Sequence, residues 1–132
     1  MKSKSIWSEY KFLSSLQLKD FLDILLEPLT DNEDKDQIKL GLHEALINAV
    51  QHGNFSDPQK HVRVRRVVTP KWFIWQIHDQ GEGLLLNKRL PILPSQESVG
   101  GRGLFIIHHC FDDVRWSQKG NRLQLAIKRF SD

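Results

Sequence analysis

The feature that most constrains the fold is a long amphipathic helix predicted between Glu33 and His52. Its apolar residues recur at helical spacing and predict one buried stripe: Ile38, Leu42, Ala45, Leu46 and Ala49. A second stripe adjoins the first on the same helix and consists of Gly41, Glu44, Asn48 and His52. An amphipathic helix needs only one apolar stripe, and its remaining surface accepts any soluble residue. A carboxylate, an amide and an imidazole in one row therefore raise the question of whether this row faces water or a ligand.

The segments on either side of this helix predict where it begins and what precedes it. The acidic turn TDNEDKD at 30–36 suits a helix N-terminus, and Gly53 is expected at the C′ position that follows the last helical residue. A shorter amphipathic helix is predicted at 14–28, with Ser14 or Ser15 as its N-cap. Pro28 marks the region where that helix stops.

The remaining segments predict strands and one more helix. Residues 61–68 and 72–78 are rich in β-branched and aromatic residues and flank TPK, which indicates a hairpin. A strand is expected at 5–12, a short helix at 102–110, and a second strand pair around the turn at 119–121. The order β, α, α, β, β, long loop, α, β, β predicts an α+β fold. We expect a two-layer sandwich in which three helices cover one face of a mostly antiparallel sheet.

Composition narrows the class of protein. With 132 residues, the chain is expected to form one domain spanning 1–132. The net charge of +3 comes without a dense run of Lys and Arg, so direct nucleic-acid binding is not expected. Neither a signal peptide nor an apolar stretch of membrane-spanning length is recognisable. The single cysteine, Cys110, is expected in the core, and the lack of a disulfide partner favours a reducing cytoplasm.

Three stretches at the ends of predicted elements combine glycine with polar residues. They are EALINAVQHGN at 44–54, DQGEG at 79–83 and GGRGL at 100–104. Each has an ordinary structural explanation when taken alone, because a Glu/Asn pair four residues apart is usually a solvated helix face. Glycines directly before a helix are more suggestive, since they let the backbone approach a phosphate at a helix N-terminus, which favours anions.

In this order and spacing, the three stretches resemble the GHKL superfamily of ATP-binding domains, whose Bergerat fold occurs in gyrases, histidine kinases and bacterial anti-sigma factor kinases. EALINAVQHGN is similar to the N box of that superfamily, DQGEG to its first glycine box and GGRGL to its second. The resemblance covers nearly the whole chain, and the closing FDDVRWSQKGNRLQLAIKR is similar to the anti-sigma serine/threonine kinase branch. It implies that ATP and Mg²⁺ are the cofactors.

Read in this light, the polar row on the long helix would face a triphosphate. The amide oxygen of Asn48 is a hard, neutral ligand that suits Mg²⁺. Glu44 lies one turn earlier on the same edge, where it could orient or deprotonate the hydroxyl that attacks the γ-phosphate. For His52 two interpretations stay open: a phosphate contact, or packing and capping at the helix end.

The first glycine box and the last turn are expected around the adenine base. Asp79 follows the strand at 72–78, where a carboxylate would accept a hydrogen bond from the adenine amine and disfavour guanine. Gly81 and Gly83 would let the backbone pass close to the base. The resemblance places Asn121 where the family usually has a threonine that helps to hold a water in the adenine site, and asparagine can supply an equivalent hydrogen bond.

The second glycine box is expected around the phosphates. Gly101 and Gly103, together with the amides that open the following helix, would cradle them, and Leu104 completes the motif. Arg102 is either a phosphate clamp or a solvent-facing spacer.

Residues 84–100 resemble the family's ATP lid. Within this segment Lys88 and Arg89 are candidate phosphate contacts or ordinary surface charges.

The function that the resemblance implies is an ATP-dependent protein serine/threonine kinase similar to anti-sigma regulatory factors. Such a protein is expected to be a homodimer that binds a sigma factor or another regulator and phosphorylates a STAS-type anti-anti-sigma protein. Two alternatives stay open: a nucleotide-gated switch that binds its partner without phosphoryl transfer, and a detached histidine-kinase catalytic domain. Glu44 favours catalysis, since binding of Mg-ATP alone would need Asn48 more than a base.

Overall fold

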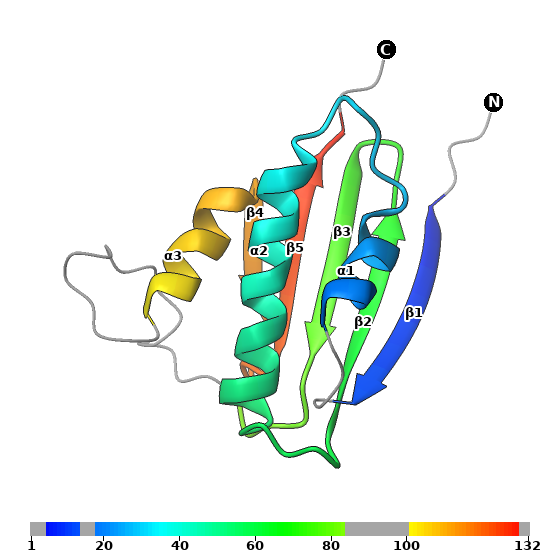
Figure 1. Cartoon of the computed structure of the whole chain (residues 1–132). Helices are drawn as coiled ribbons and strands as arrows, with labels where there is room; N and C mark the ends of the chain where they lie inside the picture. Colours follow the sequence, from blue (N-terminus) through cyan, green and yellow to red (C-terminus); the bar gives the residue numbers. More distant parts are fainter. Residues whose placement is uncertain (1–4, 14–17, 84–100, 130–132) are drawn as a thin grey trace.

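The computed structural model describes residues 5–13, 18–83 and 101–129, which form a five-stranded sheet with helices packed on one face (Figure 1). The elements, in chain order, are β1 (Ile6–Leu13), α1 (Leu18–Leu26), α2 (Lys35–Asn48), the π-helical turn η1 (Ala49–Gly53), β2 (His61–Val68), β3 (Trp72–His78), α3 (Gly101–Cys110), β4 (Asp113–Trp116) and β5 (Arg122–Lys128). The strand order is β1-β2-β3-β5-β4, and all neighbouring strands are antiparallel. The predicted α+β fold and its order of elements are confirmed.

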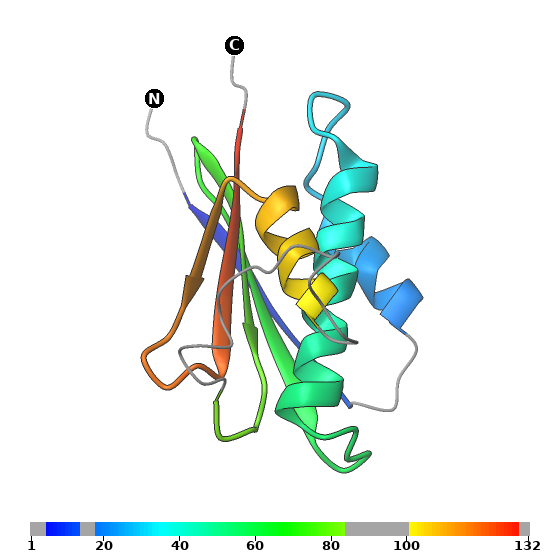
Figure 2. The same ribbon diagram turned by 90° about the vertical axis from the view of Figure 1, so that its left-hand side faces the viewer.

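Alternation along the strands decides which face of the sheet is buried. In β3, the side chains of Phe73, Trp75 and Ile77 are at most 3% exposed, whereas their neighbours in sequence are only partly buried. The register aligns Val64 with Ile77 and Trp75 with Leu125, so apolar rows run across the strands on this face. Figure 2 shows that α1, α2 and α3 all lie on the same side of the sheet.

The helices are held to the sheet by apolar packing and by a few directed contacts. The predicted stripe of α2 and the start of η1 is buried, with no member more than 5% exposed: Ile38, Leu42, Ala45, Leu46 and Ala49. The indole Nε1 of Trp75 donates to the carbonyl of Leu25 at 3.0 Å, which fixes the end of α1 over β3. Cys110, at 2% exposure, is part of the core as predicted.

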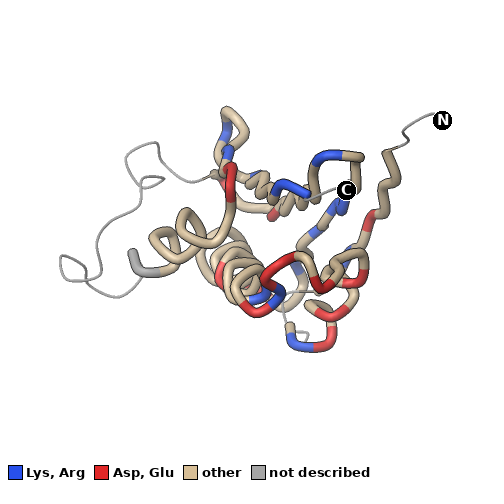
Figure 3. Tube along the Cα trace, turned by 90° about the horizontal axis from the view of Figure 1, so that it is seen from above, with Lys and Arg blue, Asp and Glu red and all other residues tan. Residues whose placement is uncertain are grey.

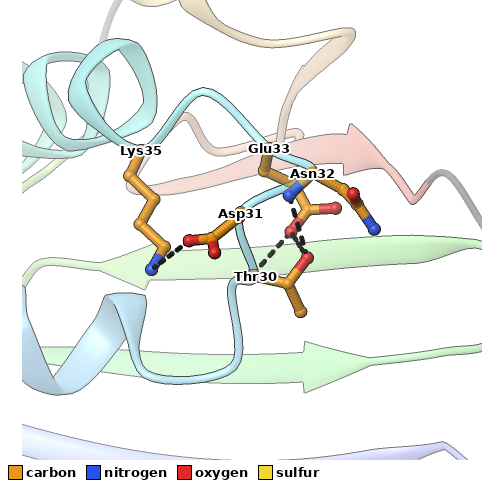
Figure 4. Close-up of polar contacts among 5 residues, drawn as sticks. All are labelled: Thr30, Asp31, Asn32, Glu33 and Lys35. Atoms are coloured by element: carbon orange, nitrogen blue, oxygen red, sulfur yellow. Dashed lines mark hydrogen bonds and ion pairs between the residues drawn. The ribbon is translucent and has the colours of Figure 1, made fainter.

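The acidic turn before α2 caps that helix, as the sequence predicts. The side chain of Asp34, the N-cap residue, accepts a hydrogen bond from the backbone N–H of Gln37 at 3.1 Å. Just before it, Glu33 Oε1 accepts from both the backbone N–H and the hydroxyl of Thr30, at 2.8 and 3.0 Å (Figure 4). The turn therefore satisfies exposed donors and places negative charge at the positive end of the helix.

The end of the long helix differs from the prediction. The regular α-helix stops at Asn48 and continues as η1 to Gly53, and the residue that caps it is Asn54, with φ of −94°. In the described part of the chain, the glycines with positive φ are Gly83 and Gly120. The prediction of Gly53 as a C′ residue is therefore wrong. Gly53 is required for a different reason, which is the close approach of another loop.

Some predictions concern residues outside the described ranges, among them the N-cap at Ser14 or Ser15 and the lid at 84–100. Among the described residues, no helix combines the length and the apolar character that crossing a membrane requires.

Candidate functional site

The start of α3 lies against the polar row of α2. A Cβ atom at Gly103 would stand 3.4 Å from both Oδ1 and Nδ2 of Asn48 and 3.4 Å from Oε2 of Glu44. The ends of these two partly buried side chains therefore converge on one point of the α3 backbone. The structure brings together three of the residues that the sequence assigned to the triphosphate, and it does so from two different motifs.

Close packing of α2 against α3 makes this convergence possible. A Cβ atom at Gly41 would lie 2.5 Å from Cε2 of Phe111 and 2.7 Å from Cβ of Cys110, distances that real Cβ atoms do not tolerate. Gly41 is thus the point at which the end of α3 rests on the backbone of α2. It belongs to the same row as Glu44 and Asn48, but its role is to set the distance between the helices.

A second group of residues assembles at the end of η1, around Asp79. The carboxylate of Asp79 occupies the space in which a side chain at Gly53 would lie, because a Cβ there would be 2.2 Å from its Cγ. A Cβ at Gly81 would come within 2.1 Å of the carbonyl oxygen of Gly53. In addition, the backbone N–H of Gly81 donates to Asp79 Oδ1 at 2.8 Å. Both glycines are therefore required for the loop with Asp79 and Gly81 to pack against the end of η1.

Burial disfavours the charged form of the Asp79 carboxyl, and this is the largest effect on its pKa. Burial raises the pKa of this carboxyl above its ordinary value, while the hydrogen bond from the Gly81 N–H and the charges of Lys60 and Lys119 act in the opposite direction on the pKa. One oxygen of this partly buried carboxylate accepts from the backbone. The carboxylate can accept a further hydrogen bond from a ligand.

Asn54 is a residue of this region that the sequence reasoning missed. It is fully buried, and its Nδ2 donates to the carbonyl of His61 at 2.9 Å while its Oδ1 accepts from the backbone N–H of Gln80 at 2.7 Å. The side chain thus joins the end of η1 to the start of β2 and to the loop that carries Asp79. Its only signal in the sequence is an amide directly after Gly53, which is also an ordinary turn residue.

The turn between β4 and β5 closes the same region. Gly83 has φ of +101°, and a Cβ there would lie 1.8 Å from the carbonyl oxygen of Lys119, so only glycine fits. The backbone N–H of Asp79 donates to the carbonyl of Asn121 at 3.0 Å. Asn121 therefore adjoins Asp79 through its main chain, and the role assigned to its side chain stays a prediction.

The other predicted residues are placed as follows. His52 is exposed in η1, and Leu104 is a buried core residue of α3 with 8% exposure. Gly101 and Arg102 open α3. Lys88 and Arg89 fall in the segment 84–100, outside the described residues.

The two groups form one candidate site along α2 and η1. Asn48 directly precedes η1 and Gly53 ends it, so the two groups lie about one helical turn apart along the same helix. In the described part of the chain, no three His, Cys, Asp or Glu side chains gather to hold a metal ion. A Mg²⁺ ion at Asn48 would accordingly take most of its ligands from phosphate oxygens and water, which is the coordination that this ion favours. The residues present therefore fit a Mg-nucleotide.

The sequence model of the histidine kinase-like ATPase domain matches residues 18–127, a range that contains all three motifs and extends from α1 into β5. The chain belongs to this family. Histidine kinase-like ATPase domains bind ATP, usually together with Mg²⁺, so the family agrees with the ligand that the geometry suggests. No curated protein shows a significant sequence match to the chain.

Proposed function

We propose that this chain is an ATP-dependent protein serine/threonine kinase of the anti-sigma factor type. The observation that carries the proposal is the convergence of Glu44 and Asn48 on Gly103. A metal ligand and a carboxylate meet there at the N-terminal part of a helix, where backbone amides favour phosphate. A site that only bound nucleotide would have less need of a carboxylate beside its metal ligand.

In the proposed reaction, each residue has a separate task. Asn48 holds the metal through its amide oxygen, and the opening turn of α3 positions the phosphates through backbone amides. When bound, Mg-ATP would supply the electrophilic γ-phosphate, and the bond from the γ-phosphorus to the β–γ bridging oxygen would break with ADP as the leaving group. Glu44 orients the attacking hydroxyl of the acceptor protein and takes its proton. A Cβ atom at Gly103 would lie in ordinary contact, 3.4 Å, with both side chains, and glycine leaves that space open for the phosphates in the proposed reaction.

At the other end of the site, Asp79 selects the base. Its free carboxylate oxygen accepts from the adenine amine, whereas guanine would present a carbonyl to it and leave two acceptors facing each other. Gly81, Gly83 and the main chain of Asn121 keep Asp79 in place.

The partners follow from the resemblance of the whole chain to anti-sigma kinases. We propose a cytoplasmic homodimer that binds a sigma factor or a similar regulator. The acceptor of the phosphate would be a serine or threonine hydroxyl of a STAS-domain protein.

Incubation of the full chain with radiolabelled Mg-ATP and a candidate STAS protein tests the proposed function. The proposal predicts a label on the partner that survives acid, as a phosphoserine or phosphothreonine does. An acid-labile label would instead indicate transfer to histidine. If ATP binds and no partner is labelled, the nucleotide-gated switch becomes the better account.

A further inference from the structure

The face of the sheet away from the helices is open. In the described part of the chain all three α-helices lie on the other side of the sheet (Figure 2). Alternation along each strand turns every second side chain towards this open face, and the strand register aligns these side chains in rows across the sheet. Neighbouring rows are two residues apart, which is roughly 7 Å along a strand. The make-up of the rows indicates what kind of ligand the face suits.

One row of the open face is cationic across four strands. Lys11 of β1 lies opposite Arg63 of β2, and on the other side of Arg63 lies His78 of β3. His78 in turn lies opposite Arg122 of β5. The three basic residues are exposed, and the row contains no acidic residue. Like charges directly opposite each other destabilise a sheet, so this row has a cost that an anionic ligand would offset.

The imidazole of His78 does not offset these charges. Burial lowers the pKa of His78 most, and the charges of Arg63, Arg122 and Lys119 lower it further. Its Nδ1 lies 2.8 Å from Nη2 of Arg63, where the neutral ring accepts a hydrogen bond from the guanidinium. The cationic row therefore presents positive charge that no side chain of the row neutralises.

The acidic residues of the open face are already engaged. Among the side chains that the strands turn to this face, only Glu9 and Asp113 are acidic. Glu9 forms an ion pair with Arg65 at 3.3 Å, and Asp113 forms one with Arg115 at 2.8 Å. Neither carboxylate belongs to the cationic row, so the attraction of that row for an anion remains.

The row next to the cationic one carries two amides at its centre. Gln76 of β3 lies opposite Gln124 of β5, and its Nε2 donates to Oε1 of Gln124 at 2.8 Å. A side-chain amide has two N–H donors and an oxygen with two lone pairs, so this one hydrogen bond leaves both amides able to pair with a ligand. Such groups suit the polar edges of a nucleic-acid base.

The following row is apolar and ends in a tryptophan. It runs from Trp7 through Val67 to Ile74. Trp7 is 62% exposed, and the guanidinium of Arg65 lies over its ring at 5.2 Å from the centroid. A second tryptophan, Trp72, is on the same face two residues from Ile74. Flat aromatic rings with neighbouring cations are surfaces on which bases stack.

We propose that the open face of the sheet binds single-stranded nucleic acid, with phosphates over the cationic row and bases over the polar and apolar rows. A nucleotide has the same division, since an anionic phosphate is joined to a flat base with polar edges. Sheets that carry aromatic side chains bind single strands in this manner. The chain lacks a dense basic run, but the strand register gathers cations that are far apart in the sequence. The inference goes beyond the proposed function and does not depend on phosphoryl transfer.

Other anionic partners fit the open face less well. A membrane would require apolar side chains that protrude beyond the charged ones, whereas Val67 and Ile74 are only partly exposed and Ala126, in the same row, is 4% exposed. An acidic peptide would use the cationic row but would leave the amides and the tryptophans without a role.

Fluorescence anisotropy of labelled oligouridylate and oligothymidylate, titrated with the full chain in the absence of ATP, tests the proposal. Oligonucleotides of about 12 nucleotides match the usual site size of proteins that bind single strands. We expect a Kd below about 10⁻⁴ M, and a slope of roughly −2 for log affinity against log salt, which corresponds to about three phosphate contacts. Comparison of the two oligonucleotides distinguishes RNA from DNA as the ligand.

Charge variants test the cationic row. Arg63→Ala and Arg122→Ala each remove one cation, so each should make the salt slope shallower by about 0.7 and raise the Kd about fivefold at roughly 0.1 M salt. Arg63→Lys keeps the charge and should keep the slope. Lys39→Ala removes a positive charge from α2, on the helix side of the sheet, and should leave the Kd unchanged.

Tryptophan variants test stacking separately from charge. Trp7→Ala removes a ring and no charge, so the Kd should rise on the order of fivefold to a hundredfold while the salt slope stays the same. Trp7→Phe keeps an aromatic ring and should recover most of the affinity. Oligothymidylate should also quench the tryptophan fluorescence of the wild type, because Trp7 and Trp72 are two of the four tryptophans and lie on this face.

Four outcomes would overturn the proposal. They are a wild type that binds neither oligonucleotide at about 10⁻⁴ M, binding that neither arginine variant weakens, equal affinity for a duplex of the same length, and equal affinity for polyglutamate or phosphatidylserine vesicles. The last outcome would assign the open face to an acidic protein or a membrane. Circular dichroism of each variant identifies any loss of folding, and fluorescence quenching of the wild type tests the face without a substitution.

Discussion

At the scale of single residues, the proposed contact of Asp79 with adenine would favour recognition at a cost in stability. The carboxylate of Asp79 is desolvated, and one of its oxygens is engaged by the Gly81 N–H. Asp79→Asn keeps an oxygen for that hydrogen bond but can present a donor to the adenine amine. We expect ATP affinity to fall by about 1–3 kcal/mol, the cost of a mispaired buried group. Thermal stability should not fall, because a buried charge has been removed. Calorimetric titration and thermal unfolding measure the two effects, and equal affinity of the wild type for ATP and GTP would refute the assignment.

The raised pKa of Asp79 also predicts a pH dependence. Because the folded-state pKa lies above the unfolded value, the folded protein binds this proton more tightly. The unfavourable contribution to stability is therefore present at neutral pH and is relieved as the pH falls through the folded pKa. The proposed contact with adenine requires the ionised carboxylate, so ATP affinity should weaken over the same range. Titrations across a pH series should show this loss in the wild type, while Asp79→Asn should lack it.

Asn54 is predicted to position the loop that carries Asp79. Asn54→Ala removes the partners of the His61 carbonyl and the Gln80 N–H, so the free energy of unfolding should fall by roughly 1–3 kcal/mol. The preference for ATP over GTP should also narrow, because Asp79 loses its fixed position. Asn32→Ala, an exposed asparagine changed in the same way, should shift stability by less than about 0.5 kcal/mol. Urea unfolding and nucleotide competition test both points, and an unchanged preference in a destabilised Asn54→Ala would leave it a purely structural residue.

At the scale of elements, the contact of α2 with α3 sets the geometry of the site. Alanine in place of a helical glycine ordinarily stabilises a helix by about 1 kcal/mol. Gly41→Ala should instead lower the free energy of unfolding by roughly 1–3 kcal/mol, because the added Cβ collides with Phe111 and Cys110. Phosphoryl transfer should fall as well, since Gly103 is displaced from Glu44. Leu40→Ala, on the adjacent exposed position, serves as the control, and a stabilised Gly41→Ala would contradict the packing account.

The elements themselves could be predicted from the sequence, because their signals are local. Strands 61–68 and 72–78 have the bounds that alternation and β-branched residues indicate. The end of the long helix could not be predicted in the same way. A glycine after a helix usually adopts a left-handed conformation, and this general tendency led to the wrong prediction of Gly53 as the C′ residue. At Gly53 the reason for glycine is a carboxylate 26 residues later in the chain, a contact that no local pattern encodes.

At the scale of the whole molecule, the layers were predictable and the distribution of charge was not. The net charge of +3 conceals an uneven distribution of charge, in which acidic residues concentrate on the helix side with a few lysines among them (Figure 3). The open face of the sheet carries basic side chains that the strand register aligns: Lys11, Arg63, Arg65, Arg115, Arg122 and Lys128. Acidic residues gather instead around α1 and the start of α2: Asp20, Asp23, Glu27, Asp31, Glu33, Asp34 and Asp36. Only the pairing of distant strands brings the basic residues together.

The candidate site was predictable as a set of residues but not as a geometry. Glu44, Asn48 and Asp79 were assigned from motif spacing, whereas Gly41 and Asn54 act through contacts that only the folded chain reveals.

The stability of the whole folded molecule should respond to its ligand. Mg-ATP at about 100 times its Kd should raise the free energy of unfolding by about 2.7 kcal/mol, because only the folded state binds it. Chemical unfolding with and without Mg-ATP checks this, and identical curves would argue against nucleotide binding.

The central claim is that Glu44 and Asn48 serve different steps at one point of the site. Asn48→Ala removes a metal ligand and should weaken Mg-ATP binding itself. Glu44→Gln keeps the shape of the side chain but removes the base, so nucleotide affinity should stay nearly intact. Single-turnover phosphorylation of the partner should then fall by roughly 10²–10⁴-fold. The effect would be smaller if the proton leaves late in a loose transition state.

The most direct measurement pairs calorimetric ATP affinity with single-turnover transfer on the wild type and both variants. The account predicts lost binding for Asn48→Ala and lost transfer with retained binding for Glu44→Gln. A Glu44→Gln variant that phosphorylates the partner as fast as the wild type would contradict it.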